Sequence, residues 1–307
     1  MDYLDVSDLG GRQRVFRARF KLDAPGYYSH ITQRAAGKEP LFLENSDYLT
    51  LLGILKEATE KFDVRMHALC LMPNHVHLLL RPEEKNLAEA MRSIFSRYAM
   101  KFNRKYERRG HLFGGPYRQA VCLDSTYLLT ASLYIHLNPV RAGMVQQPSS
   151  YRWSSCTLYT QTGGEGSDSF IDPEPILTSI HPRSAEARKE YEKLLLRGRE
   201  LQPDNALEQE GAIESFCSKL ASVFPALFRR VAGKDKLGQP AVDFELLDVT
   251  RLEQRLEDIK HMRSQRPETM RARKYLVQQL LARGYKKTEI AERLGVSRQT
   301  IYDTLDT

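Results

Sequence analysis

Two histidines, His75 and His77, interrupt the otherwise apolar stretch LMPNHVHLLL at residues 71–80. Successive side chains of a β-strand alternate between its faces, so in a strand both imidazoles point the same way, about 6.6 Å apart. Two imidazoles on one face suit the binding of one metal ion. Most His-x-His pairs serve no metal, so a third ligand and a reacting group are needed.

Both are found in the segment YIHLN, where Tyr134 and Asn138 are four residues apart. In a helix this spacing brings the two side chains to one face, so a phenol and an amide oxygen approach the same point. Spacing alone also fits a tyrosine that simply packs on a sheet. Because the residue before a proline avoids helical geometry, Pro139 predicts that the helix ends near Leu137 and that Asn138 lies at its end.

Hydrophobic periodicity supplies the elements that must position these residues. It predicts strands at about 27–34, 64–71, 75–80 and 117–123, and helices at about 46–62, 86–106 and 126–137. Ser46 is the expected cap of the first helix, and Asp124 or Ser125 of the third. The order β-α-β-β-α-β followed by α predicts an α+β, ferredoxin-like fold with an antiparallel sheet, in which the histidine strand is central.

A basic surface is expected on the second helix. Residues 91–118 contain eight basic residues and one acid, Glu107, which accounts for the whole net charge of +7. Arg97, Lys101, Arg104, Lys105 and Arg108 follow helical spacing, and Arg109 extends the row. Such a stripe can follow a phosphate backbone, and the scarcity of acids favours this over an ordinary solvated face.

The C-terminal region is expected to be all-α and to end in a helix-turn-helix. Apolar Ile290, Ala291 and Leu294 precede Gly295, and Ser297 can cap a second helix with Ile301 inward. A supporting helix is predicted at about 268–283. The second helix would present Arg298, Gln299 and Thr300 to duplex DNA, although an ordinary helical hairpin has the same pattern.

Composition divides the chain into four parts. A Gly/Ser/Thr-rich stretch, TQTGGEGSDS at residues 160–169, predicts a linker at 159–171 after a first domain at 1–158. Residues 172–266 are helical in pattern and carry no interpretable motif. Residues 267–307 form the predicted DNA-binding domain. The four cysteines form no CxxC pair and no apolar run is long enough to span a membrane, which favours a reducing, cytoplasmic location.

Four segments in order, PGYYSHITQR, MPNHVHLLL, YIHLNPVRAGMV and YRWSS, resemble the REP-associated tyrosine transposases, which are single-tyrosine HUH transposases. The resemblance covers about residues 25–155. It implies an HUH catalytic domain that cuts and rejoins single-stranded DNA near hairpins through a 5′-phosphotyrosine. DNA is then the expected partner: single-stranded and hairpin DNA at the catalytic domain, and duplex DNA at the helix-turn-helix.

The resemblance also implies the site residues. Tyr134 is the nucleophile, and His75 and His77 bind Mg²⁺ or Mn²⁺. Relatives commonly carry glutamine where this chain has the shorter Asn138, so Asn138 is the expected third ligand and His136 its substitute. Arg141 in NPVRAG is expected to contact phosphate or to cap the local turn. Whether the protein acts as a monomer or a homodimer stays open.

Three alternatives remain at this point. Tyr127, seven residues before Tyr134 and on the same helix face, is the main rival nucleophile, while Tyr98, Tyr106 and Tyr117 compete on composition alone. A DNA-binding regulator with an inactive catalytic domain would need only the helix-turn-helix. A zinc hydrolase would use His75 and His77 without Tyr134, since imidazole and oxygen ligands also suit zinc.

Overall fold

The computed structural model describes residues 21, 23, 25–37, 39–122, 124–161, 169–201, 212–233, 249–260, 267–282 and 287–306. Three predicted features lie outside these residues: Leu123 at the end of the fourth strand, 162–168 in the linker, and 283–286 before the helix-turn-helix. Within the described ranges, no helix has the length and apolar character needed to cross a bilayer.

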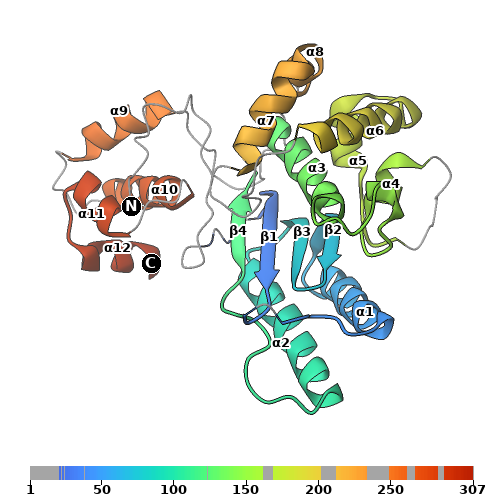
Figure 1. Cartoon of the computed structure of the whole chain (residues 1–307). Coiled ribbons are helices and arrows are strands. Elements are labelled where there is room, and N and C mark those ends of the chain that lie inside the picture. Colours follow the sequence, from blue (N-terminus) through green and yellow to red (C-terminus); the bar gives the residue numbers. More distant parts are fainter. Residues whose placement is uncertain are drawn as a thin grey trace.

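Four strands form one antiparallel sheet in the order β2-β3-β1-β4 (Figure 1). They are β1 (Ser29–Arg34), β2 (Val64–Met72), β3 (His75–Pro82) and β4 (Arg118–Val121). Helix α1 (Asn45–Lys61) follows β1, and α2 (Leu87–Lys105) follows β3. The α+β, ferredoxin-like prediction is confirmed, and the strand carrying both histidines is central.

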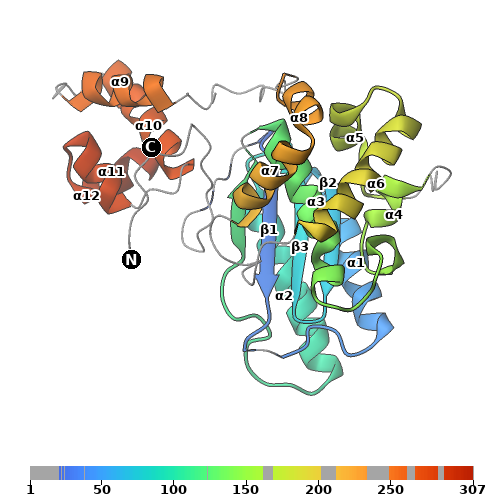
Figure 2. The same ribbon diagram turned by 45° about the horizontal axis from the view of Figure 1, so that its top comes forward.

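Alternation along β3 separates two hydrophobic clusters. Val76, Leu78 and Leu80 belong to the cluster formed with α1 and α2 on one face of the sheet. Leu79 belongs to the cluster on the other face, which α3 (Ser125–Arg141) covers (Figures 1 and 2). Because side chains two apart share a face, His75 and His77 lie on the side of α3.

Helix α3 is buried without interruption from Ser125 to Pro139, as expected for a helix that is apolar nearly all round. Its N-cap is Asp124, whose Oδ1 accepts a hydrogen bond from the Tyr127 backbone N–H at 2.7 Å, as predicted. The predicted end near Leu137 is wrong. Pro139 is accommodated inside the last turns, where burial on all sides outweighs the missing hydrogen bond.

The first helix also begins differently from the prediction. Its N-cap is Glu44, and Ser46 lies inside the first turn. The Asp47 carboxylate accepts hydrogen bonds from the backbone N–H groups of Leu43 and Glu44, at 2.8 and 3.1 Å. These two bonds satisfy donors that the helix leaves unpaired, so the acidic side chain of the first turn replaces the expected serine.

A second layer of helices covers the outer side of α3. The helices between residues 174 and 232, α5–α8, share one hydrophobic cluster with α3 and with the sheet face beneath it (Figure 2). The linker predicted from the sequence at 159–171 thus lies between two regions that share one hydrophobic core in the structure. The elements after α3 are η2 (Pro148–Ser150), α4 (Cys156–Thr160), α5 (Glu174–Ile180), α6 (Ser184–Glu200), α7 (Ala212–Val223) and α8 (Pro225–Ala232).

The YRWSS segment closes the open edge of the sheet at β2. The Tyr151 hydroxyl donates to the Leu71 carbonyl at 2.8 Å, and the Ser155 N–H donates to the Leu69 carbonyl at 3.0 Å. The Leu71 N–H in turn donates to the Trp153 carbonyl at 2.9 Å. Edge groups that would otherwise be unpaired are therefore satisfied by a segment 80 residues further on.

The C-terminal helices form a third cluster of their own. They are α9 (Val249–Lys260), α10 (Pro267–Ala282), α11 (Lys287–Leu294) and α12 (Arg298–Asp306). Gly295 between α11 and α12 has φ +63°, a conformation that favours glycine, and the Ser297 hydroxyl caps α12 at the Thr300 N–H at 3.1 Å. Leu252 and Leu256 of α9 pack into the same cluster, so α9 belongs with this unit.

Gly198 tests the packing of the second layer on α3. An added Cβ at Gly198 in α6 would lie 2.9 Å from Leu137 Cδ1 of α3 and 2.9 Å from Phe216 Cζ of α7. Both neighbours are fully buried, so Gly198→Ala should lower the free energy of unfolding by about 1–3 kcal/mol through overpacking. The measurement is urea denaturation followed by circular dichroism.

The matched control is Gly53 of α1, where an added Cβ meets nothing within 4 Å. Gly53→Ala should raise the free energy of unfolding by about 0.5–1 kcal/mol, because alanine favours helix. Equal stability of the two variants would contradict the close packing of α6 on α3.

Candidate active site

The two histidines of β3 form the centre of the site. Their ring centroids lie 4.9 Å apart with the ring planes at 88°. His75 Nδ1 is 2.7 Å from Asn74 Oδ1, so the His75 N–H donates to that amide oxygen and Nε2 keeps a lone pair. His77 is buried, and its Nε2 has no hydrogen-bond partner in the described part of the chain.

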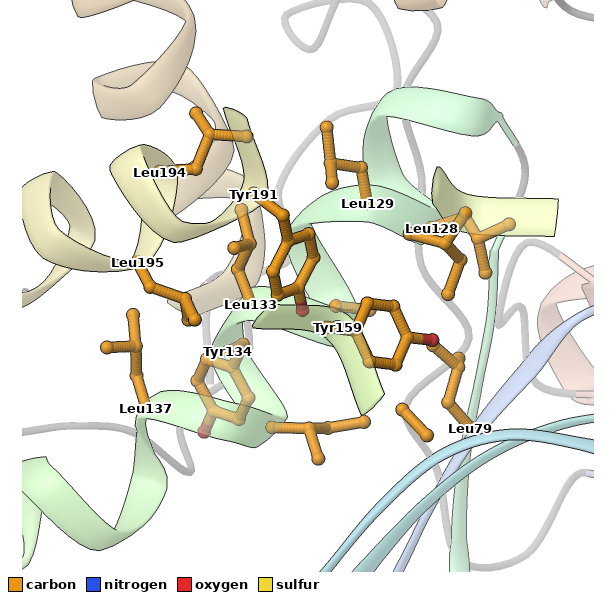
Figure 3. Close-up of a cluster of buried hydrophobic side chains, with 14 of the residues drawn as sticks. Leu79, Leu128, Leu129, Leu133, Tyr134, Leu137, Tyr159, Tyr191, Leu194 and Leu195 are labelled. Atoms are coloured by element: carbon orange, nitrogen blue, oxygen red, sulfur yellow. The ribbon is translucent and has the colours of Figure 1, made fainter. Parts of the chain in front are cut away.

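Tyr134 of α3 meets this pair within the same chain. Its ring centroid lies 5.9 Å from that of His77, with the rings at 83°. The tyrosine side chain is largely buried, among leucines of α3 and α6. Figure 3 shows its hydroxyl oxygen directed away from Tyr191 and Leu194, at the border of the cluster. The structure therefore brings together His75, His77 and Tyr134.

Strand β1 adds three residues that were not singled out from the sequence. Thr32 is the Cα partner of His77 in the β1–β3 ladder, and Arg34 is the partner of His75. His30 Nε2 lies 2.9 Å from His77 Nδ1. The alternation of side chains in SHITQR already indicated that residues 30, 32 and 34 share one face of strand β1. The antiparallel pairing of β1 with β3 places that face beside the two histidines.

Both imidazoles are neutral at pH 7. Burial, with the Arg34 guanidinium as second cause, lowers the pKa of His75 to about 4. Burial also lowers the pKa of His77 well below its usual range, and the neighbouring His75, His30 and Arg34 add to this. A neutral imidazole is the form that binds a metal ion, so the site favours ligation over protonation.

Two guanidinium groups lie near Tyr134. The Arg141 guanidinium lies 5.1 Å from the Tyr134 ring centroid and 4.7 Å from that of Phe216 in α7. Its three nitrogens are buried and have no hydrogen-bond partner among the described residues. Burial lowers the pKa of Arg141 to about 10, and the interaction with Tyr134 opposes that shift. Burial also lowers the pKa of Arg34, again opposed by Tyr134.

Asn138 follows Tyr134 by one helical turn and is buried. Its side-chain N–H donates to the Tyr134 carbonyl at 2.9 Å, which leaves its carbonyl oxygen for other contacts. The structure gives it no hydrogen bond to His75 or His77. His136 is occupied elsewhere, because its Nδ1 lies 2.7 Å from the Tyr191 hydroxyl and its Nε2 lies 2.8 Å from Ser155 Oγ.

The donor set fits a divalent ion in part. Among the described residues no three His, Cys, Asp or Glu side chains come together as a metal-binding group. His75 and His77 nevertheless present two neutral imidazoles on one face of the sheet. The buried Nε2 of His77 has no hydrogen-bond partner among the described residues. A metal ion bound here would take its remaining ligands from amide, water or substrate oxygens, as Mg²⁺ and Mn²⁺ prefer.

The rival tyrosines lie elsewhere. Tyr98, Tyr106 and Tyr117 pack with the cluster on the opposite face of the sheet. Tyr127 lies in the first turn of α3, where its backbone N–H is capped by Asp124. At 1.5 Å per residue, it is about 10 Å along the helix axis from Tyr134.

Comparison with known families bears on this arrangement. Residues 24–138 match a family model described as Transposase IS200 like. This segment is therefore similar to the IS200-like transposases. The matched segment ends at Asn138 and contains His75, His77 and Tyr134. Residues 269–307 match a second model, described as Homeodomain-like domain, which agrees with the predicted helix-turn-helix.

A solved structure described as "Structure of the REP associates tyrosine transposase bound to a REP hairpin" is similar to part of the chain. The identity is 15%, the TM-score is 0.39, and the match covers 44% of this chain and 79% of that chain. A comparison with curated proteins found no match.

The basic face of α2 is partly neutralised by ion pairs. Arg97 forms an ion pair with Glu57, Lys105 with Glu44 and Asp47, and Arg108 with Glu39. These acids come from α1 and the segment before it, which the local charge count did not include. Lys101, Arg104 and Arg109 are exposed and make no ion pair within the described ranges.

In the homeodomain-like unit, α12 presents Arg298 and Gln299 as exposed side chains. Gln299 Nε2 donates to Asp303 Oδ1 at 2.8 Å on the same helix. Thr300 is half-buried and its hydroxyl lies 2.8 Å from Ser297 Oγ, so it belongs to the helix cap. Exposed Tyr302, with the Lys287 amine 3.7 Å from its ring centroid, was not predicted.

Proposed function

We propose that this chain is a metal-dependent endonuclease and strand transferase for single-stranded DNA, with Tyr134 as its nucleophile. The observation that carries the proposal is the 5.9 Å between the Tyr134 and His77 ring centroids, inside an IS200-like transposase domain. A zinc hydrolase that does not use Tyr134 in catalysis would not require the Tyr134 ring to lie this close to His77. An inactive catalytic domain would leave the close approach of His75, His77 and Tyr134 unexplained.

His75, His77 and Asn138 are the proposed ligands of Mg²⁺ or Mn²⁺. The neutral imidazoles and the unpartnered Nε2 of His77 support the first two, and the carbonyl oxygen of Asn138 is the atom left for ligation. A divalent ion in this place supplies Lewis acidity to the scissile phosphate. His136 is not proposed, because both of its ring nitrogens are already hydrogen-bonded.

The chain's own residues perform the transfer. The Tyr134 oxygen forms a bond to phosphorus while the bond from phosphorus to the 3′-oxygen breaks, and the phenolic proton is passed to that oxygen. The products are a 5′-phosphotyrosine and a free 3′-hydroxyl. Because the phosphodiester energy is kept in the covalent bond, the 3′-hydroxyl of a second strand reverses the step and joins the ends.

Arg34 and Arg141 are the proposed contacts to the reacting phosphate. Both are electrostatically coupled to Tyr134, so an anion brought to the tyrosine is attracted by two partly buried cations. For Arg141, a phosphate would also supply acceptors to nitrogens that have none in the described residues. Their charge compensates the negative charge that gathers on the phosphate oxygens during attack.

We further propose that Tyr134 acts at the histidines of its own chain, so that a monomer is sufficient. Helix α3 is enclosed by the sheet on one side and by α5–α8 on the other. Exchange of this helix between subunits would expose a helix that is buried from Ser125 to Pro139. The apolar area involved makes such an exchange costly.

The nucleophile is tested with a pool of DNA hairpins flanked by random single-stranded segments, incubated with Mg²⁺ or Mn²⁺ and separated on a denaturing gel. A label at the 3′ end should migrate with the protein, and a label at the 5′ end should not, because the phosphate stays with the downstream strand. Tyr134→Phe should abolish the covalent band. Tyr127→Phe is the control and should retain it; an adduct that persists without the Tyr134 hydroxyl refutes the assignment.

The basic face of α2 predicts a graded effect on binding. Lys101→Ala and Arg104→Ala should weaken binding of single-stranded DNA and lower the slope of log affinity against log salt by about 0.7 for each lost phosphate contact. Arg97→Ala should have a smaller effect, because Arg97 is already paired with Glu57. Fluorescence anisotropy over a salt series measures this, and equal slopes in all three variants and the parent would exclude the proposed track.

The exposed residues of α12 predict duplex binding. Arg298→Ala should reduce affinity for duplex DNA about tenfold, since a good side-chain contact to a base contributes about 1–3 kcal/mol. Lys219→Ala, an exposed charge on α7, is the matched control and should leave duplex affinity unchanged. Gel-shift titration distinguishes them. If Arg298→Ala binds duplex DNA as the parent does, α12 is not the reading helix.

A further inference from the structure

The inner nitrogen of His77 is held by strand β1. His77 Nδ1 lies 2.9 Å from His30 Nε2 and 3.3 Å from Thr32 Oγ1. The two imidazole rings stack with centroids 5.1 Å apart and planes at 26°. All three residues are buried, at 1%, 2% and 5% exposure for His30, His77 and Thr32, so water does not replace these contacts.

A neutral imidazole carries its proton on only one nitrogen. If His77 carried it on Nε2, His77 Nδ1 would instead accept a hydrogen bond from His30 Nε2–H, and a proton would occupy the nitrogen that a metal ion needs. If Nδ1 carries the proton, it donates to His30 Nε2, with Thr32 Oγ1 as a second and longer acceptor. Nε2 of His77 then presents a lone pair.

The second imidazole of the pair is arranged in the same way. His75 Nδ1 is occupied by Asn74 Oδ1 at 2.7 Å, so its Nε2 also carries the lone pair. Each imidazole thus has its Nδ1 engaged by a neighbouring acceptor and its Nε2 left for a ligand. His30 performs for His77 the part that Asn74 performs for His75.

We propose that His30 is a positioning residue that accepts the Nδ1 proton of His77 and so sets the tautomer in which His77 binds a divalent cation. The inference rests on the metal site of the proposed function. At 2.9 Å from His77 Nδ1, His30 Nε2 leaves no room for an ion between the two rings, so His30 acts through His77 and does not ligate. Outer partners of this kind orient metal-binding imidazoles and raise their basicity.

The binding test uses the full chain without DNA, with free Mn²⁺ measured by electron paramagnetic resonance. His30→Leu should weaken Mn²⁺ binding about 10- to 100-fold, the usual effect of losing an outer partner. His30→Gln should restore binding to within about threefold of the parent, because its carboxamide reaches the position of the lost Nε2. His30→Asn reaches only the position of Nδ1 and should bind as poorly as His30→Leu.

The matched control is His67 of β2, another buried histidine, whose Nδ1 lies 2.8 Å from the Asp172 carbonyl. His67→Leu removes a buried imidazole without touching His77 and should leave Mn²⁺ affinity unchanged. The ranking of the Gln and Asn variants at His30 reports on position and not on fold stability. Equal binding by the parent, His30→Leu and His30→Gln would overturn the proposal.

A second readout separates this proposal from the proposed function. Long-range ¹H–¹⁵N correlation spectra of the metal-free chain report which nitrogen of His77 carries the proton. The expected result is Nδ1–H in the parent and in His30→Gln, and a mixture or Nε2–H in His30→Leu. A parent chain with the proton on Nε2 overturns the role of His30. A parent that shows Nδ1–H and does not bind Mn²⁺ upholds the tautomer control and refutes the metal site instead.

Discussion

The burial of α3 against one face of the sheet is the constraint on which the site depends. One side of the helix packs on the face of the sheet that β2 and β3 form, and helices α5–α8 enclose the other side. This packing keeps the Tyr134 ring beside His77, with the two ring centroids 5.9 Å apart. Positions of reacting groups set by a close-packed core change little with solvent or salt, and such precision is what in-line phosphoryl transfer requires.

Charge gives the site its second property. Buried neutral imidazoles, two partly desolvated guanidinium groups and a phenol occupy one region, and the groups identified there include no carboxylate. A desolvated cation is unfavourable unless an anion reaches it. In the proposed function this arrangement is complementary to a phosphodiester, whose charge would be shared between the arginines and the divalent ion.

Much of the fold was predictable because its determinants are local. Alternation and turn residues located the four strands, and Gly295 with Ser297 located the C-terminal turn. Errors arose where distant packing decides: Pro139 is tolerated inside a helix enclosed on all sides, and Glu44 with Asp47 replaces the expected Ser46 cap. His30 was missed because its role depends on the β1–β3 register, and the ion pairs of α2 were missed because their acids lie 40 or more residues earlier.

The central claim is that a phenolic oxygen of this chain becomes bonded to DNA. The most direct measurement is tandem mass spectrometry of the covalent complex after nuclease trimming and proteolysis. The account predicts a nucleotide joined through its 5′-phosphate to the peptide that contains Tyr134, with fragment ions assigning the added mass to that residue. A nucleotide found on Tyr127 or on any other side chain, or DNA cleavage with no peptide–nucleotide product, would contradict the account.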